Sequence, residues 1–242
     1  MKKTCLNTIL MSTFLFFLFG AGLAFGWHDK THLAISKAAG YENWYNSAGP
    51  DITKVKASDA EATNHWFNNT AGVTVTEKMV LNQAMNYNNP NDREGHLLGA
   101  IIATLRSYIA AKGDEKPAGY PMAFCAHYIG DLSMPFHNSP NNAYNNLHHK
   151  ENDGTIECVV MNDVGFIQSK IYDIDIKCEE DVAREIAKIA NNSRTLATKL
   201  EKDGKNMTPE QAYDQITQSA SLLKAVLKYT AVTIKNRADG CK

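Results

Sequence analysis

The sequence has no excess of basic residues, no closely paired cysteines and no internal repeat. Lys and Arg number 25 against 26 Asp and Glu, so the formal net charge is −1. This balance excludes the strongly basic surface of a duplex-DNA-binding protein. No two cysteines have the CxxC spacing of a structural zinc site. With no long low-complexity linker, the 242 residues are enough for one medium domain with a hydrophobic core, or at most two small ones.

The N-terminus has the three parts of a secretory signal peptide. Basic "MKKT" is followed by an apolar run over Ile9–Phe25 and by the small residues of "AFG". The run is a little short for a membrane span. We therefore expect residues 1–26 to be cleaved and residues 27–242 to form the mature chain, secreted or periplasmic; a retained anchor is the alternative. Cleavage would remove two lysines and no acid, which leaves 23 basic against 26 acidic residues and a net charge of −3.

Cleavage would also remove one of the five cysteines. The mature chain would keep Cys125, Cys158, Cys178 and Cys241. In an oxidising compartment these four can form two disulfides in three connectivities, and the sequence does not choose among them. We expect Cys125 to be a small buried residue.

Helical periodicity dominates the rest of the chain. Apolar spacing and terminal signals predict helices over residues 32–40, 76–87, 97–113, 122–132, 178–204 and 208–235. Gly113 and Gly204 are natural stops, and Thr208 with Gln211 forms a capping box. Only residues 155–161, "TIECVVM", have strand-like character, and one short β-branched run does not make a sheet. We therefore predict a single all-α domain.

The stretch "HYIGDLSMPFH" gives the first sign of a metal site. His127 and Asp131 are four residues apart, so they project from the same face of a helix. Pro135 cannot continue that helix, so the chain turns and His137 can fold back toward the same face. A His–Asp pair alone is more often an ordinary helix pair, but the following histidine strengthens the metal-site interpretation.

A second His–Asp pair follows in "HHKEND". His149 and Asp153 again have the spacing of two ligands on one helical turn. His148, with Glu151 three residues later, is the rival pair. A polar solvated loop is the ordinary interpretation of this stretch.

Three further candidate ligands precede these pairs. His32 lies five residues after Trp27 in "WHDKTH", Asp51 lies in "AGPDIT" and His65 in "NHWFNN". Taken singly, each indicates only a capping Asp or a surface His.

Together these residues resemble those of the zinc-dependent bacterial phospholipases C and the secreted single-strand-specific nucleases of fungi and plants. The shared pattern is an N-terminal Trp, a His five residues later, Asp and His fourteen apart, HxxxDxxxxxH, and Hxxx(D/E). In HxxxDxxxxxH, the Tyr, Gly, Asp and Pro positions also agree with the family. The resemblance spans Trp27 to Asp153, about half of the chain.

The resemblance implies three zinc ions held by nine residues. The first zinc would be held by Asp51, His65, His127 and Asp131. The second would be held by His137, His149 and Asp153. The third would be held by the α-amine and carbonyl of Trp27, by His32 and by a bridging Asp131. Signal cleavage would then matter chemically, because only a freed α-amine at Trp27 can give up a proton to a metal.

The chemistry of such a cluster suits a phosphodiester substrate. Nitrogen and carboxylate ligands suit zinc, and zinc lowers the pKa of bound water to about 7. Three zinc ions, three carboxylates and one hydroxide leave a charge of about +2, which attracts an anion and stabilises the charge that develops at phosphorus. We therefore expect a phospholipase C-like phosphodiesterase that uses a zinc-bound hydroxide as nucleophile. Asp51 is also a candidate proton acceptor.

The substrate is less well defined by the sequence. Trp66 and Asn68 are candidate substrate-binding residues, because in the single-strand nucleases an aromatic residue beside the histidine equivalent to His65 stacks a base. The family often has an acid where this chain has Asn68, so base recognition does not transfer directly, and Trp66 or Phe67 can equally be core residues. The compact length and the lack of a basic stripe favour a phospholipid over single-stranded nucleic acid.

Other classes of function stay open. The same ligands suit a non-catalytic zinc-binding protein, or a membrane-tethered binding module if the signal is retained. We expect peripheral membrane contact and no obligate protein partner. The remaining residues considered receive no role: His28, Trp44, His96 and His148. His96 is expected at the surface.

Overall fold

The computed structural model describes residues 27–56, 59–70, 72–111 and 116–238. The expected signal peptide, the Gly113 stop and Cys241 lie outside these residues. The helices are α1 (Asp29–Ala38), α2 (Gly49–Lys56), α3 (Asp59–Ala62), α4 (Glu77–Gln83), α5 (Leu97–Ala110), α6 (Lys116–Leu132), α7 (Ala143–Asp153), α8 (Val164–Lys170), α9 (Glu179–Asp203) and α10 (Pro209–Ala238). Four short 3₁₀ helices join them: η1 (Trp44–Asn46), η2 (Ala84–Asn86), η3 (Pro135–Asn138) and η4 (Val160–Asn162).

The predicted single all-α domain is confirmed. The described residues contain no β-strand, and each of the six predicted helices is present, with ends shifted by a few residues. The strand-like stretch 155–161 forms turns that lead into η4. Within the described ranges, every helix is too short or too polar to cross a lipid bilayer.

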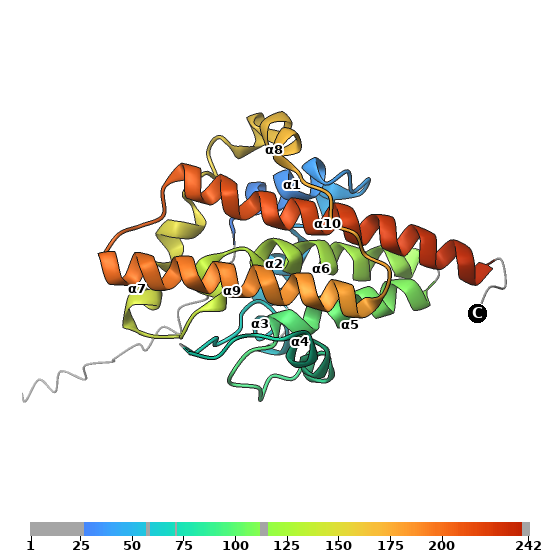
Figure 1. The fold of residues 1–242 in the computed structure, drawn as a ribbon, viewed down its shortest axis with the longest axis horizontal. Helices are drawn as coiled ribbons and strands as arrows, with labels where there is room; N and C mark the ends of the chain where they lie inside the picture. Colours follow the sequence, from blue (N-terminus) through green and yellow to red (C-terminus); the bar gives the residue numbers. More distant parts are fainter. Residues whose placement is uncertain (1–26, 57–58, 71, 112–115, 239–242) are drawn as a thin grey trace, which may run out of the picture.

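The predicted helix ends have their expected chemistry. Gln211 N donates to Thr208 Oγ1 at 3.2 Å, and Thr208 N donates to Gln211 Oε1 at 2.9 Å, which completes the capping box of α10. Gly204 ends α9 in the left-handed region, with φ of 60°. These local signals set the limits of the two longest helices, which lie in front of α5 and α6 in Figure 1.

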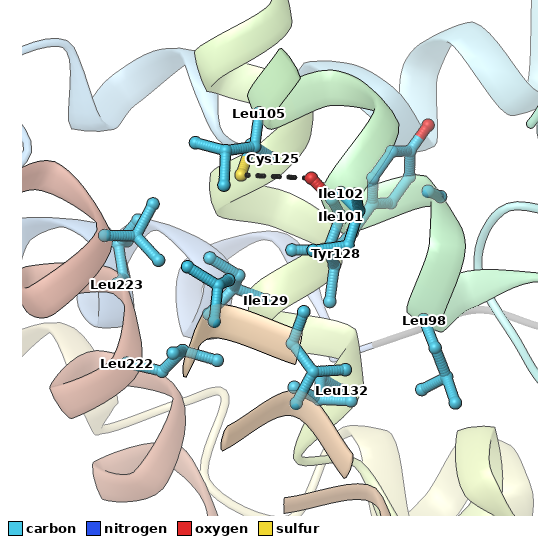
Figure 2. Packing of buried hydrophobic residues seen from close by; sticks show 14 of the residues in the cluster. Leu98, Ile101, Ile102, Leu105, Cys125, Tyr128, Ile129, Leu132, Leu222 and Leu223 are labelled. Carbon is cyan, nitrogen blue, oxygen red and sulfur yellow. Dashed lines mark hydrogen bonds between the residues drawn. The ribbon is translucent and has the colours of Figure 1, made fainter. Parts of the chain in front are cut away.

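The main core lies where α5 and α6 pack together and are covered by α9 and α10. Figure 2 shows the close packing of α5, α6 and α10 side chains: Leu98, Ile101, Ile102, Leu105, Tyr128, Ile129, Leu132, Leu222 and Leu223. Each fully buried Leu or Ile contributes about 1.5–3 kcal/mol to folding. This packing fixes α6 in the centre of the domain, and α6 carries His127 and Asp131.

Cys125 belongs to this core, as expected. Its side chain is fully buried, and its Sγ donates to Ile101 O at 3.8 Å. Cys158 and Cys178 are exposed, and all three described cysteines are free thiols. The two disulfides considered from the sequence are therefore not formed among them.

A second apolar cluster holds α1 and the chain around Trp27. It joins α1 to η3, η4, α8 and the first half of α10, near the upper edge of the molecule in Figure 1. Trp27 is fully buried in it. The first described residue of the chain is thus packed firmly against the body of the domain.

Candidate metal centre

The C-terminal end of α6 and the following turn bring His127, Asp131 and His137 to one place. α6 ends at Leu132, and η3 begins at Pro135. His137 then returns toward the helix, with its Nδ1 3.6 Å from Asp131 Oδ1. The turn expected at Pro135 is therefore present.

Asp51, His65 and His127 form a compact group of possible ligands, with their ligand atoms within 4.8 Å of one another. Asp51 Oδ1 lies 3.8 Å from His65 Nδ1 and 3.7 Å from His127 Nε2, and the two nitrogens are 3.1 Å apart. Zinc–ligand bonds of about 2.0–2.1 Å in a tetrahedron place neighbouring ligand atoms about 3.3–3.4 Å apart. The observed spacings fit one such ion.

Asp131 lies between this group and two further histidines. Its Oδ2 is 2.9 Å from His65 Nδ1 and 3.3 Å from His127 Nε2. Its Oδ1 is 3.3 Å from His32 Nε2 and 3.6 Å from His137 Nδ1. A carboxylate that has separate histidines at its two oxygens has the arrangement of a bridging ligand.

His32 reaches Asp131 from α1, across the surface of α6. Its ring stacks on the His127 ring, with centroids 3.8 Å apart and an interplanar angle of 17°. On Gly130, a Cβ would lie only 2.4 Å from His32 Nδ1. His32, His127 and Asp131 form the second group of possible ligands.

The third group is His137, His149 and Asp153. His149 and Asp153 lie on α7, and His149 Nε2 is 3.5 Å from Asp153 Oδ2. The His137 and His149 rings are 4.8 Å apart. The structure thus brings together, in three adjoining groups, all eight side chains that the resemblance implies besides Trp27.

The rival histidine, His148, is directed elsewhere. Its Nδ1 lies 2.8 Å from Asn206 Oδ1, and its ring stacks on Tyr144 with centroids 4.1 Å apart. The geometry therefore favours His149 over His148 as a ligand.

Outer hydrogen bonds orient three of the histidines. His127 Nδ1 lies 2.7 Å from Ser47 O and His149 Nδ1 lies 2.8 Å from Asn145 Oδ1, so in both rings Nε2 faces the other candidate ligands. His65 has the opposite arrangement, with Nε2 3.2 Å from Glu61 Oε1. Metal-binding histidines usually donate their second ring N–H to a carbonyl or carboxylate in this way.

Glu61 is itself held by a buried polar network that the sequence did not predict. Tyr128 Oη donates to Glu61 Oε1 at 2.6 Å, and Asn64 Nδ2 donates to Glu61 Oε2 at 3.1 Å. Asn64 Oδ1 lies 2.7 Å from His96 Nε2, and His96 Nδ1 lies 3.1 Å from Asp92 Oδ2. The expectation that His96 is a surface residue is wrong: it is fully buried, and Asp92 and Asn64 are partners for both of its ring nitrogens.

The burial of the carboxylates is the strongest physical sign of a cation site. Asp131 and Asp153 are fully buried, and neither oxygen of Asp153 has a hydrogen-bond partner. Burial and the nearby Asp131 raise the pKa of Asp153 well above its ordinary value. An uncompensated buried carboxylate destabilises a fold by several kcal/mol, and a divalent cation would remove that penalty. The donor set and its spacing therefore fit zinc.

Nearby histidines compensate the negative charge of Asp131. Burial would raise the pKa of Asp131, but His127 and His137 outweigh it and hold that pKa well below its ordinary value. Burial alone would lower the pKa of His127, but Asp131 and Asp51 raise it to about 9. His127 and Asp131 thus form a tightly coupled buried pair.

Lys54 is a second residue that the sequence did not predict at the site. Its ammonium is almost fully buried, 3.5 Å from Asp51 Oδ1. Burial raises the pKa of Asp51, but His127, His65 and Lys54 together lower it below the ordinary value. In the sequence, Asp51 and Lys54 have only the i,i+3 spacing of any helical ion pair, so nothing marks Lys54 out.

The remaining predicted site residues have varied surroundings. Trp27 Nε1 donates to Ser133 Oγ at 3.3 Å, just beyond Asp131. Trp66 is half-buried, and Phe67 packs against the main core. The side chain of Asn68 donates to Glu94 Oε2 at 2.8 Å and accepts from Asn141 N at 3.2 Å, so both ends of its amide are already bonded.

No family model matches the chain, and no curated protein matches it either. The function must therefore be inferred from the arrangement of the buried histidines and carboxylates.

Proposed function

We propose that the mature chain is a secreted or periplasmic zinc-dependent hydrolase of phosphodiester bonds, similar in activity to phospholipase C. The observation that carries the proposal is the close arrangement of the three groups: His127 belongs to two of them, and Asp131 lies near His32, His65, His127 and His137. Single-ion structural sites need only one closed set of four ligands. Adjoining sets around one carboxylate support a centre with several ions.

The three ions would have the ligands that the family resemblance implies. Asp51, His65, His127 and Asp131 would hold one, and His137, His149 and Asp153 a second. His32, Asp131 and the freed terminus of Trp27 would hold the third. When bound, zinc supplies Lewis acidity: it lowers the pKa of water and offsets the negative charge that develops at phosphorus.

The protein's own side chains and backbone orient the candidate ligands and exclude solvent from part of the centre. Ser47 and Glu61 fix the rings of His127 and His65 through their second nitrogens. Asp131 and Asp153 are closed off from solvent, whereas Asp51 and His149 each retain 12% exposure. We therefore expect substrate to approach from the side of α2 and α7, where Asp51 is the candidate proton acceptor. The Lys54 ammonium, almost fully buried beside Asp51, adds positive charge to this side of the centre.

Phospholipid is the preferred substrate class. The mature net charge of −3 opposes the binding of a long polyanion, because nucleic-acid binding depends on many basic contacts to phosphates. A single-strand-specific nuclease is the second candidate. It is favoured by Trp66, an incompletely buried aromatic side chain next to His65 that could stack a base.

The test combines metal analysis with two parallel assays on purified mature protein. We expect bound zinc, release of the head group from phosphatidylcholine, loss of that activity with a chelator and recovery on adding zinc. Cleavage of single-stranded DNA instead would select the nuclease. Bound zinc without turnover of either substrate would support the non-catalytic zinc-binding alternative, and absence of zinc would overturn the proposal.

A further inference from the structure

Glu157 caps the first turn of α1 from a distant part of the chain. Its Oε1 accepts from Lys30 N, and its Oε2 accepts from both Thr31 N and Thr31 Oγ1, each at 3.1 Å. His28, the N-cap residue, provides no side-chain cap. Thr31 N also donates to His28 O at 2.9 Å, so its hydrogen bond to Glu157 is a second one. The first N–H groups of a helix lack partners within it, and a carboxylate at this place satisfies that of Lys30 and also favours the helix dipole.

The segment around Glu157 is anchored in the second apolar cluster. Ile156 and Val160 are fully buried in the same apolar cluster as Trp27. The segment follows directly from Asp153, the last residue of α7. Glu157 therefore connects the helix that carries the His149–Asp153 pair to the start of α1.

The capped turn lies between two residues of the proposed third zinc site. His32 follows Thr31 directly, and its Nε2 lies 3.3 Å from Asp131 Oδ1. Trp27 precedes the turn, and its indole is held by Ser133 at the end of α6. Freedom in this turn would move the His32 ring and the terminus at Trp27 relative to Asp131.

We propose that Glu157 is the positioning residue of the third metal site. By capping α1, it holds Trp27 and His32 against Asp131, and it links the assembly of this site to α7. This inference rests on the proposed function, because it presupposes that the centre binds zinc. It concerns the site at His32, because the ligands that belong only to the other two sites, Asp51, His65, His137, His149 and Asp153, lie outside α1.

The experiment compares Glu157→Ala and Glu157→Gln with wild type and with Glu179→Ala. Glu179 is a suitable control, since its carboxylate also accepts hydrogen bonds with both oxygens, from Arg106 Nε at 2.9 Å and Nη2 at 2.6 Å, but it lies on α9. Zinc per chain is measured over a range of buffered free zinc. Amide hydrogen exchange at Lys30 and Thr31 is measured on the zinc-free proteins.

We expect three zinc ions in wild type and in Glu179→Ala. In Glu157→Ala, two should bind unchanged and the third about tenfold or more weakly, as for other outer-shell changes. Exchange at Lys30 should be faster, and exchange at Thr31 should change less, because Thr31 N also donates to His28 O. Glu157→Gln keeps one oxygen acceptor for Thr31, so it should recover part of both effects.

Several results would overturn the inference. One is wild-type affinity for all three ions in Glu157→Ala. Another is equal weakening of all three ions in both Glu157 variants, which would show a general role in folding. Unchanged exchange at Lys30 and Thr31 would show that the cap does not form. Absence of zinc from wild type would instead overturn the proposed function, and the inference with it.

Discussion

Gly130 of α6 packs tightly against the ring of His32 at the candidate metal centre. A Cβ at this position would lie 2.4 Å from His32 Nδ1 and 2.8 Å from its Cε1. Ordinary contact begins at 3.4 Å, so Gly130→Ala must displace the ring by about 1 Å. His32 stacks on His127 and faces Asp131, so the displacement changes the geometry of a ligand and leaves the ligand itself in place.

Gly130→Ala is expected to have different effects on zinc affinity and on the stability of the zinc-free protein. Misplacing a ligand in this way should weaken the zinc ion at His32 by about 10–100-fold, or roughly 1.4–2.7 kcal/mol. Overpacking destabilises by about 1–3 kcal/mol, but replacing a helical glycine with alanine returns about 1 kcal/mol. We therefore expect Tm of the zinc-free protein to fall by no more than about 8 °C.

Gly165 provides the matched control, because it is a helical glycine whose added Cβ would meet nothing within 4 Å. Gly165→Ala should leave zinc binding unchanged and raise stability slightly. Zinc affinity is measured by competition with a chromophoric chelator, and hydrolysis of phosphatidylcholine is followed in parallel. If Gly130→Ala binds zinc as tightly as Gly165→Ala, the role given to the His32 ring is wrong.

Three further predictions concern the buried acids and histidines. Asp153→Asn removes a buried carboxylate that has no hydrogen-bond partner, so at pH 7 it should stabilise the zinc-free protein by about 1–3 kcal/mol and abolish binding of the second zinc. A loss of zinc-free stability would contradict this. Glu61→Gln should weaken zinc binding about 10–100-fold through His65, and wild-type affinity would rule out the orienting role. It should also lower the zinc-free Tm by several degrees, because its NH₂ group would face the donor Asn64 Nδ2. Burial lowers the pKa of His96 below 6.5, although Asp92 opposes this. As the pH falls, the unfolded chain therefore binds a proton at His96 at a higher pH than the folded chain does. The stability that neutral His96 contributes is present above about pH 6.5 and is lost as the pH falls below that value. Denaturant unfolding should show a shallower pH dependence in His96→Gln between about pH 5 and 7, and an identical slope would refute the assignment.

Local patterns predicted the long elements of the fold. The capping box at Thr208 and the left-handed Gly204 depend only on neighbouring residues. The start of α10 and the end of α9 could therefore be predicted from the sequence. The helices α2, α3, α7 and α8, which have between four and eleven residues, were not predicted. Packing against the rest of the domain stabilises such short helices.

Only the part of the site that depends on local spacing was predicted from the sequence. The spacing of His127, Asp131 and His137 carries geometric information, because four residues make one helical turn and proline ends the helix. Glu157 could not be found in this way, since its partners in α1 are far away in the sequence. For His96, Asp92 is only four residues away, but the burial of the pair depends on Asn64, which is distant in the sequence.

The choice between His148 and His149 also depended on the three-dimensional structure. The two residues differ by one helical position, and only the contact of His148 with Asn206 shows which face of α7 is turned toward His137. One position corresponds to about 100° around the helix, so the register of α7 decides the ligand.

The central claim is that the buried histidines and carboxylates around Asp131 hold several zinc ions. Anomalous diffraction at the zinc edge, from crystals of the mature protein, tests it most directly. We predict three anomalous peaks: one among Asp51, His65 and His127, one among His137, His149 and Asp153, and one beside His32 and Asp131. A zinc-supplemented crystal with no peak at any of these positions would contradict the claim.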